Sequence, residues 1–299
     1  MKDYLLGLYE KSMPGTLTLP EKLAEGKKAG FDYLELSIDE TDEKLARLDW
    51  SSLEIQTLLS ASKETEFPIK SICLSGHRRY PLGDPDEEVQ RKSLEIMRKA
   101  IFLAANLGVR IIQIAGYDVY YKESSDETRK IFAKNLARSV HMAAREGVVL
   151  GFETMETEFI NTVEKAVGWV QAMHSPYLQV YPDIGNLTNA SLRYGTDVLD
   201  DLAKGAGHIA AVHLKETVPG IYREVPYGTG HVNFLKDTTK SFELGVRMFV
   251  GEFWYTGQEN WREVLKQNNA FLRKALEYGE VHNDSEQTYL GGCQCSQHQ

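Results

Sequence analysis

Short apolar segments alternate with longer amphipathic segments along most of the chain. Eight apolar segments, rich in Val, Ile, Leu and Tyr, occupy residues 4–10, 33–39, 69–76, 109–117, 148–156, 178–186, 209–216 and 246–254. Their apolar residues run continuously rather than at every second position, which is typical of strands buried on both faces of a parallel sheet. The pattern therefore predicts eight buried strands.

The segments between these strands have the periodicity of helices. They lie near residues 20–29, 51–66, 86–107, 123–146, 162–174, 196–206, 233–243 and 259–278. Several end in glycine just before the next strand, as in "KKAGFDY" and "ANLGVRI", and glycine is a common helix stop signal. Eight successive strand–helix units predict an α/β fold, most simply a closed (β/α)₈ TIM barrel.

An open, doubly wound sheet is the alternative fold. It is disfavoured because no glycine-rich phosphate-binding turn follows the first predicted strand. A barrel of this kind needs no internal domain boundary, so we expect one catalytic domain over residues 1–279. The composition turns polar after that point, and residues 280–299 are expected to form a flexible tail.

Composition and charge narrow the class of protein. The chain has 299 residues, of which 42% are hydrophobic and 26% charged, as in an ordinary globular protein. Its net charge of -9 argues against a nucleic-acid partner, because phosphate backbones are bound by basic surfaces. No segment has the roughly 18 consecutive apolar residues that span a bilayer, and the first residues lack a signal-peptide pattern. We therefore expect a cytoplasmic protein with no membrane partner.

Four polar residues stand where the last four predicted strands end. They are Glu153, Asp183, His213 and Glu252. The carboxyl ends of barrel strands face one side, where active sites lie, so these side chains should meet. Three adjacent carboxylates would repel one another without a compensating cation. The oxygen and nitrogen donors suit Mn²⁺, Mg²⁺ or Zn²⁺, and the sequence predicts one divalent metal ion at this site.

Other polar residues near the strand ends are candidates for substrate binding. Glu156 and Asn186 each follow a predicted metal ligand by three residues. The basic residues, among them those of the "GHRRY" segment, could bind phosphate through charge-assisted hydrogen bonds. For each of them an ordinary structural role is the alternative. The candidates are Glu35, His77, Arg78, Glu156, Asn186, Lys215 and Arg223.

Several segments resemble one known family of enzymes. They are "GFDYLELSIDETDEKLARLDWS", "CLSGHRRYPLGDPDEEVQRKSLEIM", "IQIAGYDVYY", "VYPDIGNL", "AAVHLKET" and "YREVPYGTGHVNF". Over residues 1–279 the chain resembles the L-ribulose-5-phosphate 3-epimerases, also called L-xylulose-5-phosphate 3-epimerases, of bacterial L-ascorbate and related pentose pathways. More widely it is similar to the xylose-isomerase-like barrels, which include ketose 3-epimerases and apurinic endonucleases.

The resemblance implies roles for individual residues. Glu153, Asp183, His213 and Glu252 would hold the metal, and Glu153 and Glu252 would also be the catalytic groups that move the proton. Substrate would contact Glu156 and Arg223. Asn186 stands where ketose epimerases of free sugars commonly have a histidine.

The function implied is that of a metal-dependent 3-epimerase. It would interconvert L-xylulose 5-phosphate and L-ribulose 5-phosphate by deprotonation and reprotonation at C3 through a metal-stabilised cis-enediolate, and the enzyme would be a homodimer. Three alternatives stay open: an epimerase or aldose–ketose isomerase of unphosphorylated sugars, an apurinic-endonuclease-like metal phosphodiesterase, and a non-catalytic sugar-binding protein. The basic residues favour a sugar phosphate, and the single histidine among the ligands disfavours a multi-metal nuclease.

Overall fold

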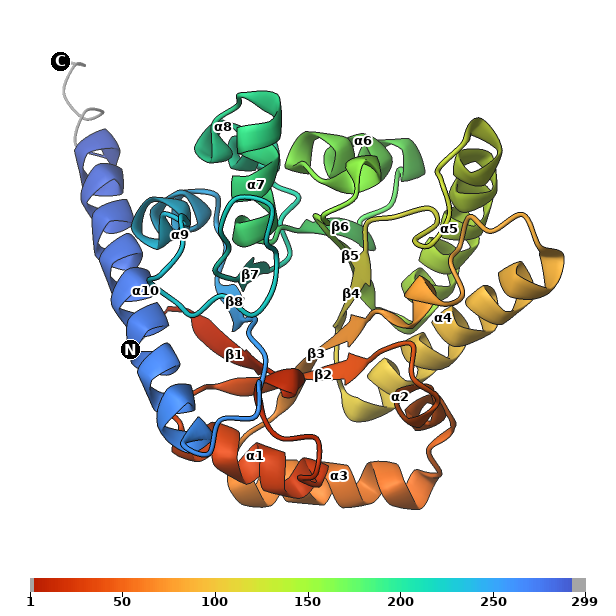
Figure 1. Cartoon of the computed structure of the whole chain (residues 1–299), viewed down its shortest axis with the longest axis horizontal. Helices are drawn as coiled ribbons and strands as arrows, with labels where there is room; N and C mark the ends of the chain where they lie inside the picture. Colours follow the sequence, from red (N-terminus) through yellow and green to blue (C-terminus); the bar gives the residue numbers. More distant parts are fainter. Residues whose placement is uncertain (1–2, 292–299) are drawn as a thin grey trace, which may run out of the picture.

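The computed structural model describes residues 3–291, in which parallel strands form a barrel viewed along its axis in Figure 1. The strands are β1 (Leu5–Tyr9), β2 (Tyr33–Ile38), β3 (Ile69–Leu74), β4 (Ile111–Ala115), β5 (Val149–Glu153), β6 (Leu178–Tyr181), β7 (Val212–Leu214) and β8 (Met248–Gly251). They pair in chain order, and β1 pairs with both β2 and β8. The bridges Val180–Ile209 and Asp183–His213 link β6 to the chain around β7, so the sheet closes as predicted.

Helices surround the barrel and follow the predicted strand–helix order (Figure 1). They are α1 (Leu19–Lys28), α2 (Asp42–Ala46), α3 (Ser52–Thr65), α4 (Glu87–Leu107), α5 (Asp126–Glu146), α6 (Val163–Met173), α7 (Ile184–Tyr194), α8 (Val198–Ala203), α9 (Phe234–Glu243) and α10 (Trp261–Gly291). Local sequence sets their ends: capping boxes at Thr18 and Ser51 begin α1 and α3. Gly108 and Gly147 end α4 and α5 with φ of 71° and 65°.

Two segments differ from the prediction. The segment 178–186 is not one strand, because Asp183 caps a new helix, α7, by accepting a hydrogen bond from the Asn186 backbone N–H. The expected tail begins inside α10, which continues to Gly291, so the first part of 280–299 is helical. Residues 292–299, with Cys293 and Cys295, lie outside the described residues.

The barrel has an apolar outer layer and a mixed interior. Leu34, Leu36 and Ile38 of β2 belong to the large cluster between strands and helices. Tyr33, of the same strand, packs in a smaller cluster with Tyr181, and alternation places Glu35 on that inner side. In the part of the chain that the structure describes, no helix combines the length and apolar character needed to cross a bilayer.

Candidate active site

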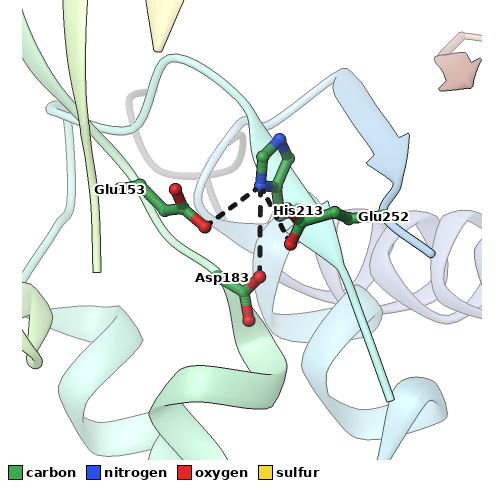
Figure 2. A group of neighbouring side chains, drawn as sticks. All are labelled: Glu153, Asp183, His213 and Glu252. Carbon is green, nitrogen blue, oxygen red and sulfur yellow. Dashed lines mark ion pairs between the residues drawn. The ribbon is translucent and has the colours of Figure 1, made fainter. Parts of the chain in front are cut away.

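The four residues predicted as metal ligands meet at the carboxyl end of the barrel (Figure 2). Glu153 is the last residue of β5, Asp183 precedes α7, His213 lies in β7, and Glu252 directly follows β8. One ligand atom from each lies within 4.8 Å of the others, and all four side chains are buried. The topology therefore gathers residues that are up to 99 positions apart in sequence.

Their geometry fits a divalent cation. His213 Nδ1 lies 3.5 Å from Glu153 Oε1, 3.6 Å from Glu252 Oε2 and 4.0 Å from Asp183 Oδ2. Two ligands on opposite sides of such an ion lie about 4.2 Å apart, so these atoms are already close to ligand spacing. No described residue makes a hydrogen bond with His213 Nδ1, and Asp183 Oδ2 and Glu252 Oε2 have no hydrogen-bond partner beyond their ion pair with Lys215. A buried polar atom without a partner is costly, and a cation would satisfy Nδ1 and offset the carboxylate charge that one lysine leaves.

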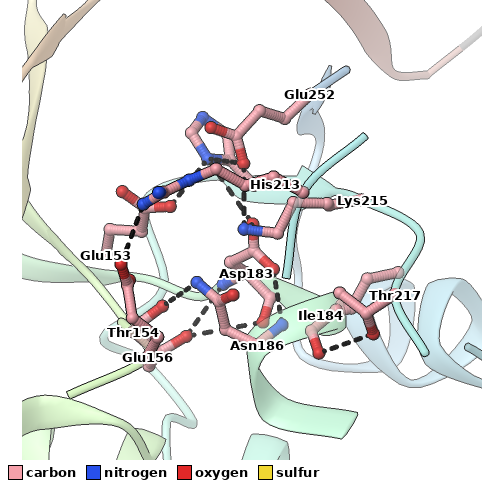
Figure 3. Close-up of polar contacts among 12 residues, drawn as sticks. Glu153, Thr154, Glu156, Asp183, Ile184, Asn186, His213, Lys215, Thr217 and Glu252 are labelled. Atoms are coloured by element: carbon pink, nitrogen blue, oxygen red, sulfur yellow. Dashed lines mark hydrogen bonds and ion pairs between the residues drawn. The ribbon is translucent and has the colours of Figure 1, made fainter. Parts of the chain in front are cut away.

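Lys215 is the basic side chain nearest to these carboxylates (Figure 3). Its Nζ lies 2.8 Å from Asp183 Oδ2 and 3.3 Å from Glu252 Oε2. Burial alone would lower the pKa of Lys215, but the surrounding carboxylates outweigh burial and raise it. Lys215 therefore stays charged and offsets part of the negative charge.

The two glutamates occupy electrostatically different places. Burial, with the nearby charge of Glu252, raises the pKa of Glu153, which also accepts a hydrogen bond from the Gln113 amide. Burial would raise the pKa of Glu252 too, but the positive charges of Lys215 and His213 outweigh it and lower that pKa to about 2. In the metal-free protein a proton taken up by the pair therefore resides on Glu153 more readily than on Glu252.

A cavity of about 130 Å³ opens above these carboxylates. Five of the seven candidate substrate-binding residues line it, namely Arg78, Glu156, Asn186, Lys215 and Arg223. Glu156 accepts hydrogen bonds from Arg223 (2.8 Å) and from the Tyr120 hydroxyl (2.9 Å), which joins the two sides of the entrance. Asn186 donates to the Thr154 carbonyl oxygen (2.7 Å), and no described residue bonds its buried Oδ1.

The other two candidates do not line the cavity. Glu35 lies in the middle of β2, three residues before its end, so its side chain sits below the cavity and contacts His213 Nε2 at 2.7 Å. His77 turns away, under α4, with Nε2 3.2 Å from the Ser93 carbonyl oxygen, and burial lowers its pKa to about 4. Successive residues of the short helical turn Gly76–Arg78 point in different directions, so only Arg78 reaches the cavity.

Sequence reasoning missed several residues of the site. Gln113 lies inside the apolar segment "RIIQIAG", and a polar residue within a buried strand is the signal that could have identified it. Trp254 also lines the cavity, and Lys215 Nζ lies 6.0 Å from the centroid of its ring. The remaining missed lining residues are Tyr9, Lys11, Cys73, Ser75, Ala115, Met155 and Tyr222.

Comparisons with known proteins agree with this fold. A family model described as a xylose isomerase-like TIM barrel matches residues 23–275. The L-ribulose-5-phosphate 3-epimerase UlaE of Escherichia coli (strain SMS-3-5 / SECEC) is 47% identical over 278 residues, which are 93% of this chain and 94% of that protein. A UlaE of Salmonella paratyphi A is 48% identical over the same shares.

Solved structures with low sequence identity share the fold alone. An L-ribulose 3-epimerase superposes with a TM-score of 0.74 at 18% identity, covering 98% of this chain and 100% of that chain. The D-psicose 3-epimerase of Clostridium cellulolyticum H10 gives a TM-score of 0.76 at 15% identity, covering 91% and 99%. The family-model match and the 47% identity show that this chain belongs to the xylose isomerase-like TIM barrel family and, within it, to the L-ribulose-5-phosphate 3-epimerases.

Proposed function

We propose that this protein interconverts L-xylulose 5-phosphate and L-ribulose 5-phosphate by inverting C3. The observation that carries the proposal is the pair of buried glutamates, Glu153 and Glu252, on either side of His213 in one cluster of metal-type ligands (Figure 2). The relatives named L-ribulose-5-phosphate 3-epimerase support the choice of substrate. A non-catalytic binding protein has no need for two acid–base groups with opposite proton preferences.

Inversion at C3 needs one group to remove a proton and another to supply one on the opposite face. We assign removal of the C3 proton to Glu252, the glutamate that loses its own proton more readily, and donation of a proton to Glu153, which keeps its proton more readily. In the reverse direction the two groups exchange roles. Lys215 beside Glu252 lowers the pKa of Glu252, and burial with the charge of Glu252 raises the pKa of Glu153, which maintains the difference between them. Both glutamates are buried, so bulk water is kept from the reacting carbon.

The cofactor proposed is one divalent cation, Mn²⁺, Mg²⁺ or Zn²⁺. Glu153, Asp183, His213 and Glu252 would hold it, through three oxygen donors and one nitrogen donor. When bound, such an ion supplies Lewis-acid stabilisation of the negative charge that develops on the substrate oxygens.

Arg78 is the residue we assign to the substrate phosphate. Three other cationic side chains line the cavity, but each has a carboxylate within 3 Å: Lys11 pairs with Asp39, Lys215 with Asp183 and Arg223 with Glu156. Arg78 has a looser ion pair, 3.7 Å from Glu40, and its buried Nε bonds no described residue. Its guanidinium therefore keeps donors for a phosphate.

The hydroxyl groups of the sugar are assigned to three other residues that line the cavity. Glu156, Asn186 and Arg223 are proposed to bind sugar hydroxyls, since each presents polar atoms along the cavity wall.

We also propose that the enzyme acts as a cytoplasmic homodimer without nucleic-acid or membrane partners. Light scattering on the purified protein measures the subunit number, and a monomer at micromolar concentration would remove that part of the proposal.

The test of the function is incubation with L-xylulose 5-phosphate, with and without a chelator, followed by identification of the product by NMR. We expect L-ribulose 5-phosphate, its loss with the chelator, and recovery when Mn²⁺ is added. Free L-xylulose is the matched substrate, and Arg78→Gln should raise KM for the phosphate ester without changing kcat/KM for the free sugar. Equal use of both sugars by the wild type would favour an epimerase of unphosphorylated ketoses, and no inversion at C3 would remove the proposal.

A further inference from the structure

Beneath the metal-type cluster, with its three carboxylates, lies a fourth carboxylate that the proposed reaction does not use. Glu35 is completely buried in the barrel interior. Its Oε2 accepts hydrogen bonds from the Ser71 hydroxyl (2.7 Å) and the Tyr181 hydroxyl (2.9 Å), and its Oε1 lies 2.7 Å from His213 Nε2. Among the described residues, no lysine or arginine forms an ion pair with Glu35, and His213 is its basic partner.

These contacts determine which way the His213 ring faces. Glu35 Oε2 already accepts from the two hydroxyls, and we assign the proton of the 2.7 Å contact to His213 Nε2, which donates to Glu35 Oε1. Nδ1 then faces Glu153, Asp183 and Glu252, as Figure 2 shows, and binding of a metal there would displace any proton that Nδ1 carries. The Tyr181 ring packs edge-on against the imidazole with centroids 4.8 Å apart, which restricts its rotation further.

We propose that Glu35 is a positioning residue for the metal site: held by Ser71 and Tyr181, it fixes the tautomer and orientation in which His213 offers Nδ1 to a divalent cation. Buried carboxylates away from the cavity are held by cations, as Glu10 is by Lys22, or by hydroxyls alone, as Asp118 is by Ser124 and Thr128. Glu35 differs from both because it also contacts His213, one of the four predicted metal ligands. The inference rests on the proposed function only in requiring that the cluster binds a metal.

The test is the affinity of metal-free protein for Mn²⁺, read from the electron paramagnetic resonance signal of the free ion. Glu35→Gln keeps the shape of the side chain, and its amide can still bond both hydroxyls, so the fold should persist. Affinity should fall by about 10- to 100-fold, the usual effect of losing a carboxylate behind a ligating histidine. Ser71→Ala removes one bond that holds Glu35 and should weaken Mn²⁺ binding in the same direction by a smaller factor.

A matched control separates this role from the loss of any buried carboxylate. Asp118 is also buried and accepts hydrogen bonds from two hydroxyls, those of Ser124 and Thr128, but it does not line the cavity. Asp118→Asn should therefore keep the wild-type Mn²⁺ affinity. Thermal unfolding of each metal-free variant reports any loss of fold independently of metal binding.

The outcomes distinguish this inference from the proposed function. If the wild type does not bind Mn²⁺, Mg²⁺ or Zn²⁺, the proposed metal site fails, and the role of Glu35 fails with it. If the wild type binds Mn²⁺ and both Glu35→Gln and Ser71→Ala bind it within a factor of two of the wild type, only the positioning role is overturned. An equal loss of affinity in Asp118→Asn would show a general effect of buried carboxylates and would also overturn it.

Discussion

Glu153→Gln and Glu252→Gln together test whether inversion uses two groups on opposite faces. Each substitution keeps the side-chain shape and an oxygen that can still act as a metal ligand, but removes one proton-transfer group. In Glu153→Gln, the neighbouring Gln113 amide can still donate to the new side-chain oxygen. In Glu252→Gln, Lys215 keeps its contact with Asp183. Both variants should therefore fold and bind Mn²⁺ at saturating concentration.

The expected loss follows from the chemistry removed. A positioned acid or base contributes about 10²- to 10⁴-fold to a rate. At about 1.4 kcal/mol for each factor of ten, the loss corresponds to roughly 3 to 6 kcal/mol of transition-state stabilisation. Since Glu153 and Glu252 act in the same turnover, the double variant should be little slower than either single one.

Solvent deuterium distinguishes the two faces of C3. In D₂O, each single variant retains one glutamate and should exchange the C3 hydrogen of one epimer without inverting it. Glu153→Gln and Glu252→Gln should label opposite epimers, as measured by NMR of L-xylulose 5-phosphate and L-ribulose 5-phosphate. If either variant keeps more than a tenth of wild-type turnover, or if both label the same epimer, the two-face mechanism is refuted.

Three further predictions concern the fold, the entrance loop and the metal. Glu10 is fully buried and forms ion pairs with Lys22, Lys44 and Arg47. Glu10→Gln should therefore lower the free energy of unfolding, measured by urea denaturation, by about 3 to 5 kcal/mol. A loss under about 1 kcal/mol would contradict this. Burial would raise the pKa of Glu10, but these cations outweigh it and lower the pKa strongly; the stabilisation is therefore present above the ordinary pKa of 4.5 and is lost on acidification. A Cβ at Gly230 would lie 2.1 Å from the Thr217 carbonyl oxygen, so Gly230→Ala should displace the loop before α9 and reduce kcat/KM about 100-fold. Gly15→Ala is the control, because a Cβ added there meets no atom within 4 Å and should leave kcat/KM unchanged. Equal kcat/KM values for the two variants would refute this prediction. Burial and nearby carboxylates raise the pKa of Asp183 to about 8 in the metal-free protein. Mn²⁺ must displace that proton, so the Mn²⁺ affinity measured by calorimetry should increase from pH 6 to about pH 8, with release of protons on binding. An affinity that does not change with pH over this range would contradict the prediction.

Much of the fold follows from local sequence. The eight continuous apolar segments each contain one observed strand, and glycine at positions 108 and 147 ends α4 and α5 as expected. Parallel strands place their carboxyl ends on one side, and this rule alone brings Glu153, Asp183, His213 and Glu252 together. The helix α7 was missed because Asp183 has two roles, as the last polar residue of a strand segment and as the cap of a helix.

The direction and depth of individual side chains depended on tertiary structure. His77, Arg78 and Arg79 are adjacent in sequence, yet one packs under α4, one lines the cavity and one pairs with Asp42 at the surface. Nothing in the local sequence separates them, because the turn that carries them has no fixed inner face. The sequence by itself determined the barrel and the set of four polar residues that meet at its carboxyl end, since these depend on periodicity and strand order. Only the closed barrel decided that Glu35 lies beneath His213 while Lys215 lies beside Asp183, because burial and contact between strands far apart in the chain set those positions.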